Sequence, residues 1–208
     1  MKHLIFDFDG TIVESGPLIY SNFAEYTKNC ELSWNELRDL PSNEVISALG
    51  VSKLDLPKLI LRIRADFKSK LKEQPIVEGI KEAITNLKEH GFELHIVSSN
   101  SEDNIDAFLA NHGLREAFTS IKSFFTIFGK AHGIEKLLKE ISASPKEAIY
   151  IGDETRDIQA AEKVGMQNLA VTWGYNSEKA LLSYKPKYLA RAPMEMVEIL
   201  CEVSGLLR

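Results

Sequence analysis

The sequence predicts an α/β fold in which helices cover both faces of a mostly parallel sheet. Two observations indicate this: short apolar runs are spaced as strands, and the segments between them repeat apolar residues at helical spacing. Because most of the runs are apolar throughout, we expect strands buried on both faces. The runs are Leu4 to Phe6, Leu94 to Val97, Phe124 to Phe128, Ala148 to Ile151, Leu169 to Thr172, and Tyr188 with Leu189.

Helical periodicity fills the segments between these runs. Two of the apolar faces end at a His-Gly pair, which is a typical helix stop signal. We expect five such helices on the sheet. Their apolar faces are Ile80, Ala83, Ile84 and Leu87; Ile105, Phe108 and Leu109; Ile134, Leu137, Leu138 and Ile141; Ile158, Ala161 and Val164; and Met196, Val197, Ile199 and Leu200.

A long segment without strand runs follows the first strand. Between about Gly16 and Gln74 the chain has helical-period segments only, and Pro75 predicts a helix boundary. We therefore expect a small helical domain over residues 15–76, inserted into a sheet domain formed by residues 1–14 and 77–208.

Composition excludes several classes of protein. The 208 residues are 44% hydrophobic and 26% charged, as in ordinary folded proteins. The net charge of −5 and the lack of a long basic run argue against nucleic-acid binding, and no apolar run approaches a membrane span. Two cysteines without CxxC spacing and a strand that begins at Leu4 predict a cytoplasmic protein without a signal peptide. The oligomeric state stays open.

Two carboxylates, Asp7 and Asp9, follow the first strand run directly. At the carboxyl end of a parallel strand they lie where such sheets bind ligands, and both point to one side if the backbone stays extended. Their repulsion is relieved by a hard cation such as Mg²⁺, so both are candidate metal ligands. One carboxylate can attack phosphorus, and the second can protonate the leaving oxygen and later activate water.

The next two residues, Gly10 and Thr11, are candidate phosphate ligands. Gly10 permits a turn that brings backbone N–H groups near an anion. Thr11 has other roles open to it, because its hydroxyl can also cap a helix or hydrogen-bond a carboxylate.

Hydroxyl and amide side chains follow the strand Leu94 to Val97. We expect the Ser98 hydroxyl to donate to a phosphate, and the backbone N–H of Ser99 to do so where the next helix begins. An N-cap with a polar turn is the alternative reading.

A lysine is expected at the same edge of the sheet. Lys130 comes after the run Phe124 to Phe128 and Gly129, where its charge can neutralise a phosphate and the nucleophile. Lys122 precedes that run, so it is expected at the opposite edge.

A second acidic segment follows the strand Ala148 to Ile151. Asp153 comes directly after Gly152 and is placed to bind metal. Asp157, four residues on, lies on the same helical face if the helix has started, and it can ligate the metal directly. Alternatively, it can orient Asp153, a metal-bound water or Lys130, or it can be an acidic first-turn residue favoured by the helix dipole. Glu154 and Arg156 are expected in solvent.

Taken together, four segments resemble the motifs of the haloacid dehalogenase superfamily: DFDGT, the serine after HIV, GK after FFTIF, and GDETRD. The tail, with AVTWGY, resembles the phosphoglycolate phosphatase-like branch. The resemblance implies a Rossmann-like core with an inserted helical cap, Mg²⁺, Asp7 as nucleophile and Asp9 as acid/base. It departs from the branch after Lys130, where Ala131 stands in place of a frequent proline.

These features predict a Mg²⁺-dependent phosphatase that hydrolyses a small phosphorylated metabolite through an aspartyl phosphate. Two alternatives use the same residues. A phosphomutase on this scaffold would pass the phosphoryl group to a sugar. A non-enzymatic regulatory protein would keep it on the aspartate.

Overall fold

The computed structural model describes residues 2–26, 32–51, 58–59, 70, 73–124 and 129–206. Within these ranges six strands form one sheet in the order β3-β2-β1-β4-β5-β6, and every neighbouring pair is parallel. The α/β, Rossmann-like prediction is therefore confirmed. The strands are β1 His3–Phe6, β2 Glu93–Ser98, β3 Phe118–Ser123, β4 Ala148–Gly152, β5 Gln167–Val171 and β6 Tyr188–Ala190.

The third strand is not where the sequence predicted it. β3 spans Phe118–Ser123 and ends before the run Phe124 to Phe128, of which Phe124 lies outside the strand and residues 125–128 lie outside the described part of the chain. β3 is an edge strand, and only Phe118 and Ile121 are buried along it. A search for continuous apolar runs misses such a strand because part of it faces solvent.

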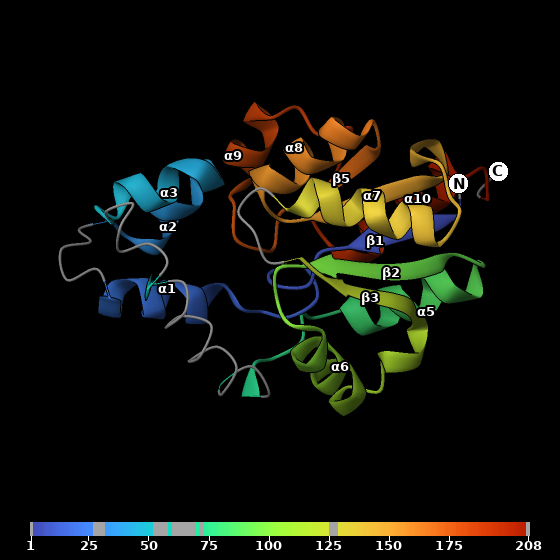
Figure 1. The fold of residues 1–208 in the computed structure, drawn as a ribbon, viewed down its shortest axis with the longest axis horizontal. Coiled ribbons are helices and arrows are strands. Elements are labelled where there is room, and N and C mark those ends of the chain that lie inside the picture. Colours follow the sequence, from blue (N-terminus) through green and yellow to red (C-terminus); the bar gives the residue numbers. More distant parts are fainter. Residues whose placement is uncertain are drawn as a thin grey trace.

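Helices pack on both faces of the sheet (Figure 1). Helices α5, α6 and α10 share one apolar cluster with the strands, and α7 and α8 share a second cluster on the opposite face. No helix in the described ranges is long and apolar enough to cross a membrane. These helices are α5 Ile80–Glu89, α6 Glu102–Asn111, α7 Lys130–Glu140, α8 Thr155–Val164, α9 Glu178–Ser183 and α10 Pro193–Val203, with short 3₁₀ helices at Arg115–Ala117 and Pro145–Glu147.

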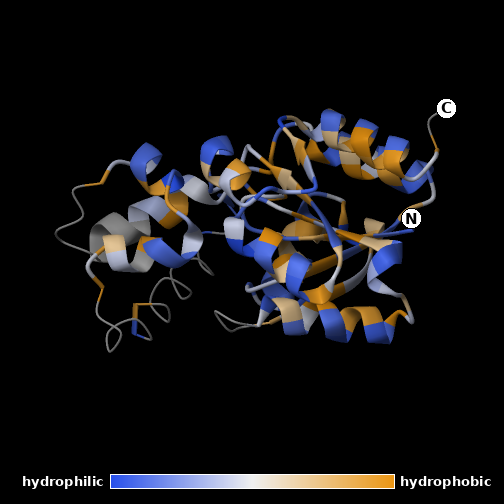
Figure 2. Cartoon of the chain, turned by 90° about the horizontal axis from the view of Figure 1, so that it is seen from above, coloured by the Kyte–Doolittle hydropathy of each residue, from blue (hydrophilic) through white to orange (hydrophobic). Residues whose placement is uncertain are grey.

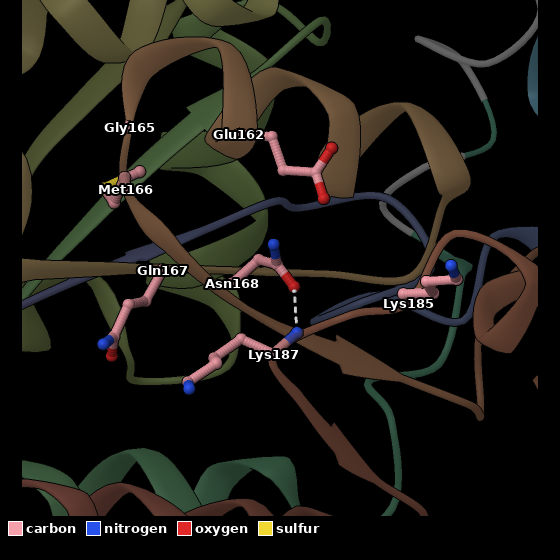
Figure 3. A pocket seen from close by; sticks show the side chains of 7 residues that line it. All are labelled: Glu162, Gly165, Met166, Gln167, Asn168, Lys185 and Lys187. Carbon is pink, nitrogen blue, oxygen red and sulfur yellow. Dashed lines mark hydrogen bonds between the residues drawn. The ribbon is translucent and has the colours of Figure 1, made fainter.

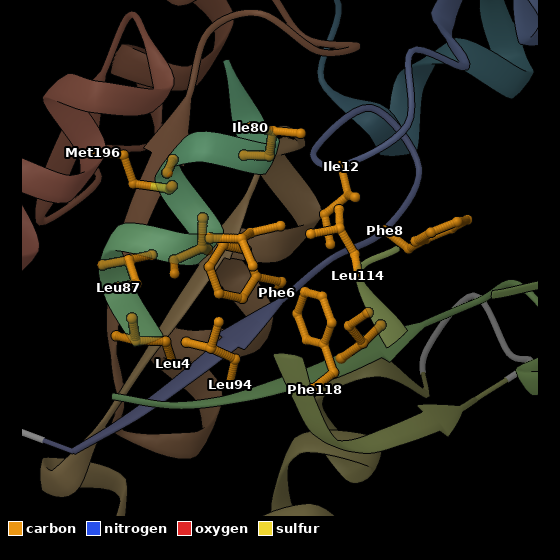
Figure 4. Close-up of a cluster of buried hydrophobic side chains, with 14 of the residues drawn as sticks. Leu4, Phe6, Phe8, Ile12, Ile80, Leu87, Leu94, Leu114, Phe118 and Met196 are labelled. Atoms are coloured by element: carbon orange, nitrogen blue, oxygen red, sulfur yellow. The ribbon is translucent and has the colours of Figure 1, made fainter. Parts of the chain in front are cut away.

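Apolar stripes on the helices face the sheet, as the hydropathy colouring of Figure 2 shows. On α5 the predicted face of Ile80, Ala83, Ile84 and Leu87 is fully buried. Figure 4 shows how Leu87 and Ile80 meet strand residues such as Leu4 and Phe6. This packing fixes the strands, and with them the loops at the carboxyl edge of the sheet.

Helices α1 Gly16–Tyr26, α2 Trp34–Arg38 and α3 Ser42–Ala48 lie together to one side of the sheet (Figure 1). The chain leaves and returns through adjacent segments, since Glu14 N–H donates to the Pro75 carbonyl and Val77 N–H donates to the Ile12 carbonyl. Leu37 and Val45 of these helices pack with Tyr175 of the sheet domain. The division into a core (1–14 and 77–208) and a cap (15–76) stays a prediction.

Candidate functional site

The site lies where the strand order reverses. β1 is the strand from which the sheet grows in both directions, with β2 on one side and β4 on the other. In open parallel sheets the crevice outside the carboxyl ends at this point is the usual binding site. Phe6 of β1 pairs with Ile151 of β4. Asp7 and Asp153 follow this pair by one and two residues, so they lie next to each other at the carboxyl ends of neighbouring strands.

Three carboxylates come together at this point. Asp7, Asp153 and Asp157 each offer one oxygen, and these oxygens lie within 4.8 Å of one another. All three residues are at most 2% exposed. Lys130 donates to Asp7 Oδ2 at 2.7 Å and also to Asp157 Oδ1. Three of the four predicted metal ligands are therefore brought together, whereas the carboxylate of Asp9 is not part of this group.

The cluster carries more negative charge than its neighbours balance. Burial, followed by the charges of Glu154, Asp7 and Asp157, raises the pKa of Asp153 well above its usual range. Burial alone would lower the pKa of Lys130, but Asp157 and Asp7 raise it well above its usual value, so this lysine stays charged. Buried carboxylate oxygens with uncompensated charge are the donor set that a hard divalent cation requires.

Asp153 is held by groups from two distant segments. Its Oδ1 accepts from the Thr11 hydroxyl at 2.8 Å, and its Oδ2 accepts from the Tyr175 N–H at 2.6 Å. Glycine is required around it: a Cβ at Gly10 would lie 2.1 Å from Oδ2, and one at Gly174 would lie 2.3 Å from the Asp153 Cβ. Gly10 also has a φ of +78°, which favours glycine.

Gly10 and Thr11, the predicted phosphate ligands, use their donors within the loop. Gly10 N–H donates to the Val13 carbonyl and Thr11 N–H donates to the Phe8 carbonyl. The Thr11 hydroxyl meets a carboxylate, which was one of its open alternatives. Direct contact of either residue with phosphate stays a prediction.

Asp9 has a different environment from Asp7. Its two oxygens accept from Asn100 Nδ2 at 3.2 and 3.4 Å. Burial, and then the charge of Asp7, raise the pKa of Asp9 to about 7 against the lowering effect of the Asn100 hydrogen bond. A carboxyl group of this kind can give up and regain a proton near neutral pH. Asn100 had no predicted role, and its only signal in the sequence is its place after a strand.

Ser98 is the last residue of β2 and is 1% exposed. Ile96 pairs with Phe6, so Ser98 lies beside the first residues after β1, at the same edge as Asp7. Its Oγ accepts from the Asn100 N–H at 3.2 Å, and its own hydroxyl proton can still be donated.

Ser99 was expected where the next helix begins, and that expectation was wrong. The helix α6 starts at Glu102, and its N-cap is Ser101, whose Oγ accepts from Asn104 N–H. Ser99 is half-buried and lies two residues before the cap. Any phosphate contact of its N–H would therefore come from the loop and not from a helix N-terminus.

Lys130 reaches the cluster from a helix. It is the first residue of α7, with Gly129 as N-cap, and its Nζ also lies 5.6 Å from the centre of the Tyr150 ring. Lys122 was expected before a strand, but it lies inside β3. Its Nζ pairs with Glu140 at 2.9 Å and so takes no part in the carboxylate cluster.

Glu154 was expected in solvent, and the structure contradicts this. Its side chain is 13% exposed and pairs with Arg156 at 2.5 Å. The Arg156 side chain is 40% exposed, so that prediction holds only in part. The Arg156 charge acts on both Asp9 and Lys130, which puts it close to the cluster.

The loop after β5 links the site to the helices α1–α3, a role that was not predicted from the sequence. Trp173 Nε1 donates to the Thr11 carbonyl at 3.1 Å. Arg38 donates to the carbonyls of Thr172 and Tyr175 at 3.1 and 3.0 Å. Asn176 is fully buried, and its side chain donates to the carbonyls of Arg38, the last residue of α2, and of Leu40. It accepts from the N–H of Thr155 in α8 and from the hydroxyl of Ser42 in α3. The loop therefore fixes the insert, the first motif and Asp153 relative to one another.

The hollow in Figure 3 is not part of this site. Glu162, Lys185 and Lys187 line it, and Lys187 N–H donates to Asn168 Oδ1 at 2.9 Å. It lies beside the first residues of β5, whereas the carboxylates follow the carboxyl ends of β1 and β4.

Comparison with known proteins agrees with this geometry. The family model for haloacid dehalogenase-like hydrolases matches residues 4–171. A phosphoglycolate phosphatase from Synechococcus elongatus is 30% identical, over 98% of this chain and 99% of the relative. A pyrophosphatase PpaX from Bacillus mycoides is 24% identical, over 97% and 98%. A solved haloacid dehalogenase-like hydrolase from Streptococcus pneumoniae has a TM-score of 0.78 at 26% identity, over 96% and 98%.

The chain belongs to the haloacid dehalogenase-like hydrolase family, as its four motifs indicated. The two relatives named above are phosphatases, and the prediction of a phosphatase is confirmed at this level.

Proposed function

We propose that the protein is a Mg²⁺-dependent phosphatase that hydrolyses a small phosphorylated metabolite through a phosphoryl group carried on Asp7. One observation carries the proposal: Asp7 lies at the strand-order reversal, held by Lys130 at 2.7 Å and grouped with two more buried carboxylates. A cytoplasmic location belongs to the same proposal.

Asp7, Asp153 and Asp157 would hold the divalent ion, which neutralises charge on the transferring phosphoryl group when it is bound. Lys130 keeps an oxygen of Asp7 in place and balances the charge of the approaching phosphate. Ser98 completes the phosphate site from the neighbouring strand. Ser99, Gly10 and Thr11 would contribute to the same phosphate site.

In the first half-reaction a carboxylate oxygen of Asp7 attacks phosphorus, and the bond from phosphorus to the leaving oxygen breaks. Asp9, with a pKa of about 7, gives its proton to that oxygen, so the alcohol leaves neutral. In the second half, Asp9 takes a proton from water as the water attacks phosphorus. The bond to Asp7 then breaks and inorganic phosphate leaves.

The substrate class is taken from the relatives and from the site. A full-length relative at 30% identity is a phosphoglycolate phosphatase, and another group of relatives cleaves pyrophosphate. We therefore propose a small phosphorylated metabolite. A screen of such compounds, including phosphoglycolate and pyrophosphate, with Mg²⁺ and with chelator, tests substrate and metal together.

The assignment of Asp7 is tested with Asp7→Asn. We expect the variant to lose hydrolysis with its fold intact, while Asp103→Asn, at an exposed aspartate on α6, keeps wild-type rates. An Asp7→Asn enzyme with full Mg²⁺-dependent activity would refute the proposal. Release of phosphate into water without a bisphosphate primer distinguishes the hydrolase from a mutase.

A further inference from the structure

A second group of potential metal ligands lies at the opposite edge of the sheet from the carboxylate cluster. His3 begins β1, and Glu93 and His95 belong to β2. His3 is four residues before Asp7, which separates the two groups by about 13 Å along the strand. The group therefore takes no part in the proposed phosphatase chemistry.

The three side chains converge on one face of two paired strands. His3 pairs with Glu93 in the sheet register, and Ile5 pairs with His95. Because side chains alternate along a strand, His3, Glu93 and His95 share the face that α7 and α8 cover. Neighbouring strands of a packed sheet hold such side chains without any loop movement.

Distances within the group match a metal site. His3 Nδ1 lies 3.2 Å from His95 Nε2 and 3.5 Å from Glu93 Oε2, and one donor atom of each residue lies within 4.8 Å of the others. Two nitrogens bound to tetrahedral zinc at about 2.0–2.1 Å lie about 3.3–3.4 Å apart. The imidazoles therefore need almost no rearrangement to bind one ion.

Within the described residues, the His95 ring is buried beside the His3 ring, with 5.4 Å between the ring centres. The ring is 0% exposed, and its Nδ1 has no hydrogen-bond partner there. Its Nε2 meets His3 Nδ1 at 3.2 Å, and a metal ion bound to both nitrogens would take the place of that contact.

We propose that His3, Glu93 and His95 form a second metal site, which takes a borderline divalent ion such as Zn²⁺ and cross-links the amino ends of β1 and β2. Imidazole nitrogens favour zinc, nickel or copper over Mg²⁺, so the two sites of the protein differ in the metal they select. The Glu93 side chain is 36% exposed and leaves water access to the ion.

Lys2 provides a sharp probe of this site. Its Nζ pairs with Glu93 Oε1 at 2.6 Å, next to the oxygen that faces His3. Removing this positive charge with Lys2→Met should tighten Zn²⁺ binding, whereas Glu93→Gln should weaken it by about tenfold or more. Residues with a purely structural role would not change metal affinity in opposite directions.

The experiment is a calorimetric titration of the tag-free full chain with Zn²⁺ in excess Mg²⁺, which occupies the carboxylate cluster. Wild type should bind one more equivalent of Zn²⁺ than His3→Gln/His95→Gln. His132→Gln, which removes an imidazole that is 75% exposed, should bind as wild type does. Titration with Co²⁺ should give visible bands from imidazole ligation that the double variant lacks.

Equal zinc stoichiometry and Co²⁺ spectra for wild type and a folded double variant would overturn the proposal. If circular dichroism shows that the double variant is unfolded, Lys2→Met and Glu93→Gln decide the question, because both alter partly exposed side chains. Unchanged affinity in both, or changes of the same sign, would then overturn it.

Discussion

Replacing Asn176 with alanine should loosen the connection between the helices α1–α3 and the sheet domain. The Asn176 side chain donates to the Leu40 and Arg38 carbonyls at 2.8 and 3.2 Å, and accepts from Thr155 N–H and the Ser42 hydroxyl at 2.8 and 3.1 Å. Each lost hydrogen bond costs about 0.5–1.5 kcal/mol, and more where a buried partner is left unpaired. The expected loss is about 3 kcal/mol in the free energy of unfolding.

A matched control is Asn168→Ala. Asn168 is also a buried asparagine of the β5 region, 5% exposed, but within the described residues its side chain accepts a single hydrogen bond, from Lys187 N–H. We expect it to lose about 1 kcal/mol. In urea unfolding followed by circular dichroism, Asn176→Ala should therefore shift the midpoint by about 1 M and the control by about a third of that.

Activity separates the two variants further. The loop of Asn176 also presents the Tyr175 N–H to Asp153, so its loosening displaces a proposed metal ligand. We expect kcat/KM of Asn176→Ala to fall by about tenfold or more, with Asn168→Ala unchanged. Equal midpoint shifts in the two variants, or full activity in Asn176→Ala, would refute this account of the loop.

Three further results are expected. Asn100→Ala removes the hydrogen bond that lowers the pKa of Asp9. Because Asp9 loses its proton near pH 7 on the alkaline limb of the kcat/KM profile, that limb should move to higher pH. An unmoved limb would contradict this role for Asn100. Gly174→Ala places a Cβ 2.3 Å from the Asp153 Cβ and should abolish activity. The control is Gly165→Ala, because Gly165 ends α8 and a Cβ there meets open space. This control should cost about 1 kcal/mol of stability and leave the rate intact. Chelation should abolish turnover and Mg²⁺ should restore it, and turnover that persists in chelator would contradict a metal-dependent reaction.

Sequence reasoning reached the site because the chemistry follows strand ends. Asp7, Ser98 and Asp153 each come at or just after the carboxyl end of a strand, and parallel strands bring those ends to one edge. Lys130 contacts Asp7 at the same edge of the sheet, although the strand expected before it lies elsewhere. The order of the motifs therefore carried more information than the boundary of any one strand.

What the sequence could not supply depends on packing between distant segments. The half-polar edge strand β3 lacks a continuous apolar run. The Asn100–Asp9 hydrogen bond joins residues 91 positions apart, and the hydrogen bond from Asn176 to the Leu40 carbonyl after α2 joins residues 136 positions apart. The pKa of Asp9 follows from burial, which no local pattern reports. Such contacts can be read only from the folded chain.

The most direct test of the central claim is to identify the residue that carries the phosphoryl group during turnover. Enzyme mixed with its phosphorylated substrate and Mg²⁺ is quenched in acid within one turnover, digested, and analysed by mass spectrometry. A phosphoryl group on Asp7, absent from Asp7→Asn, is the predicted result. Turnover with no phosphorylated peptide, or with the group on any other residue, would contradict the account.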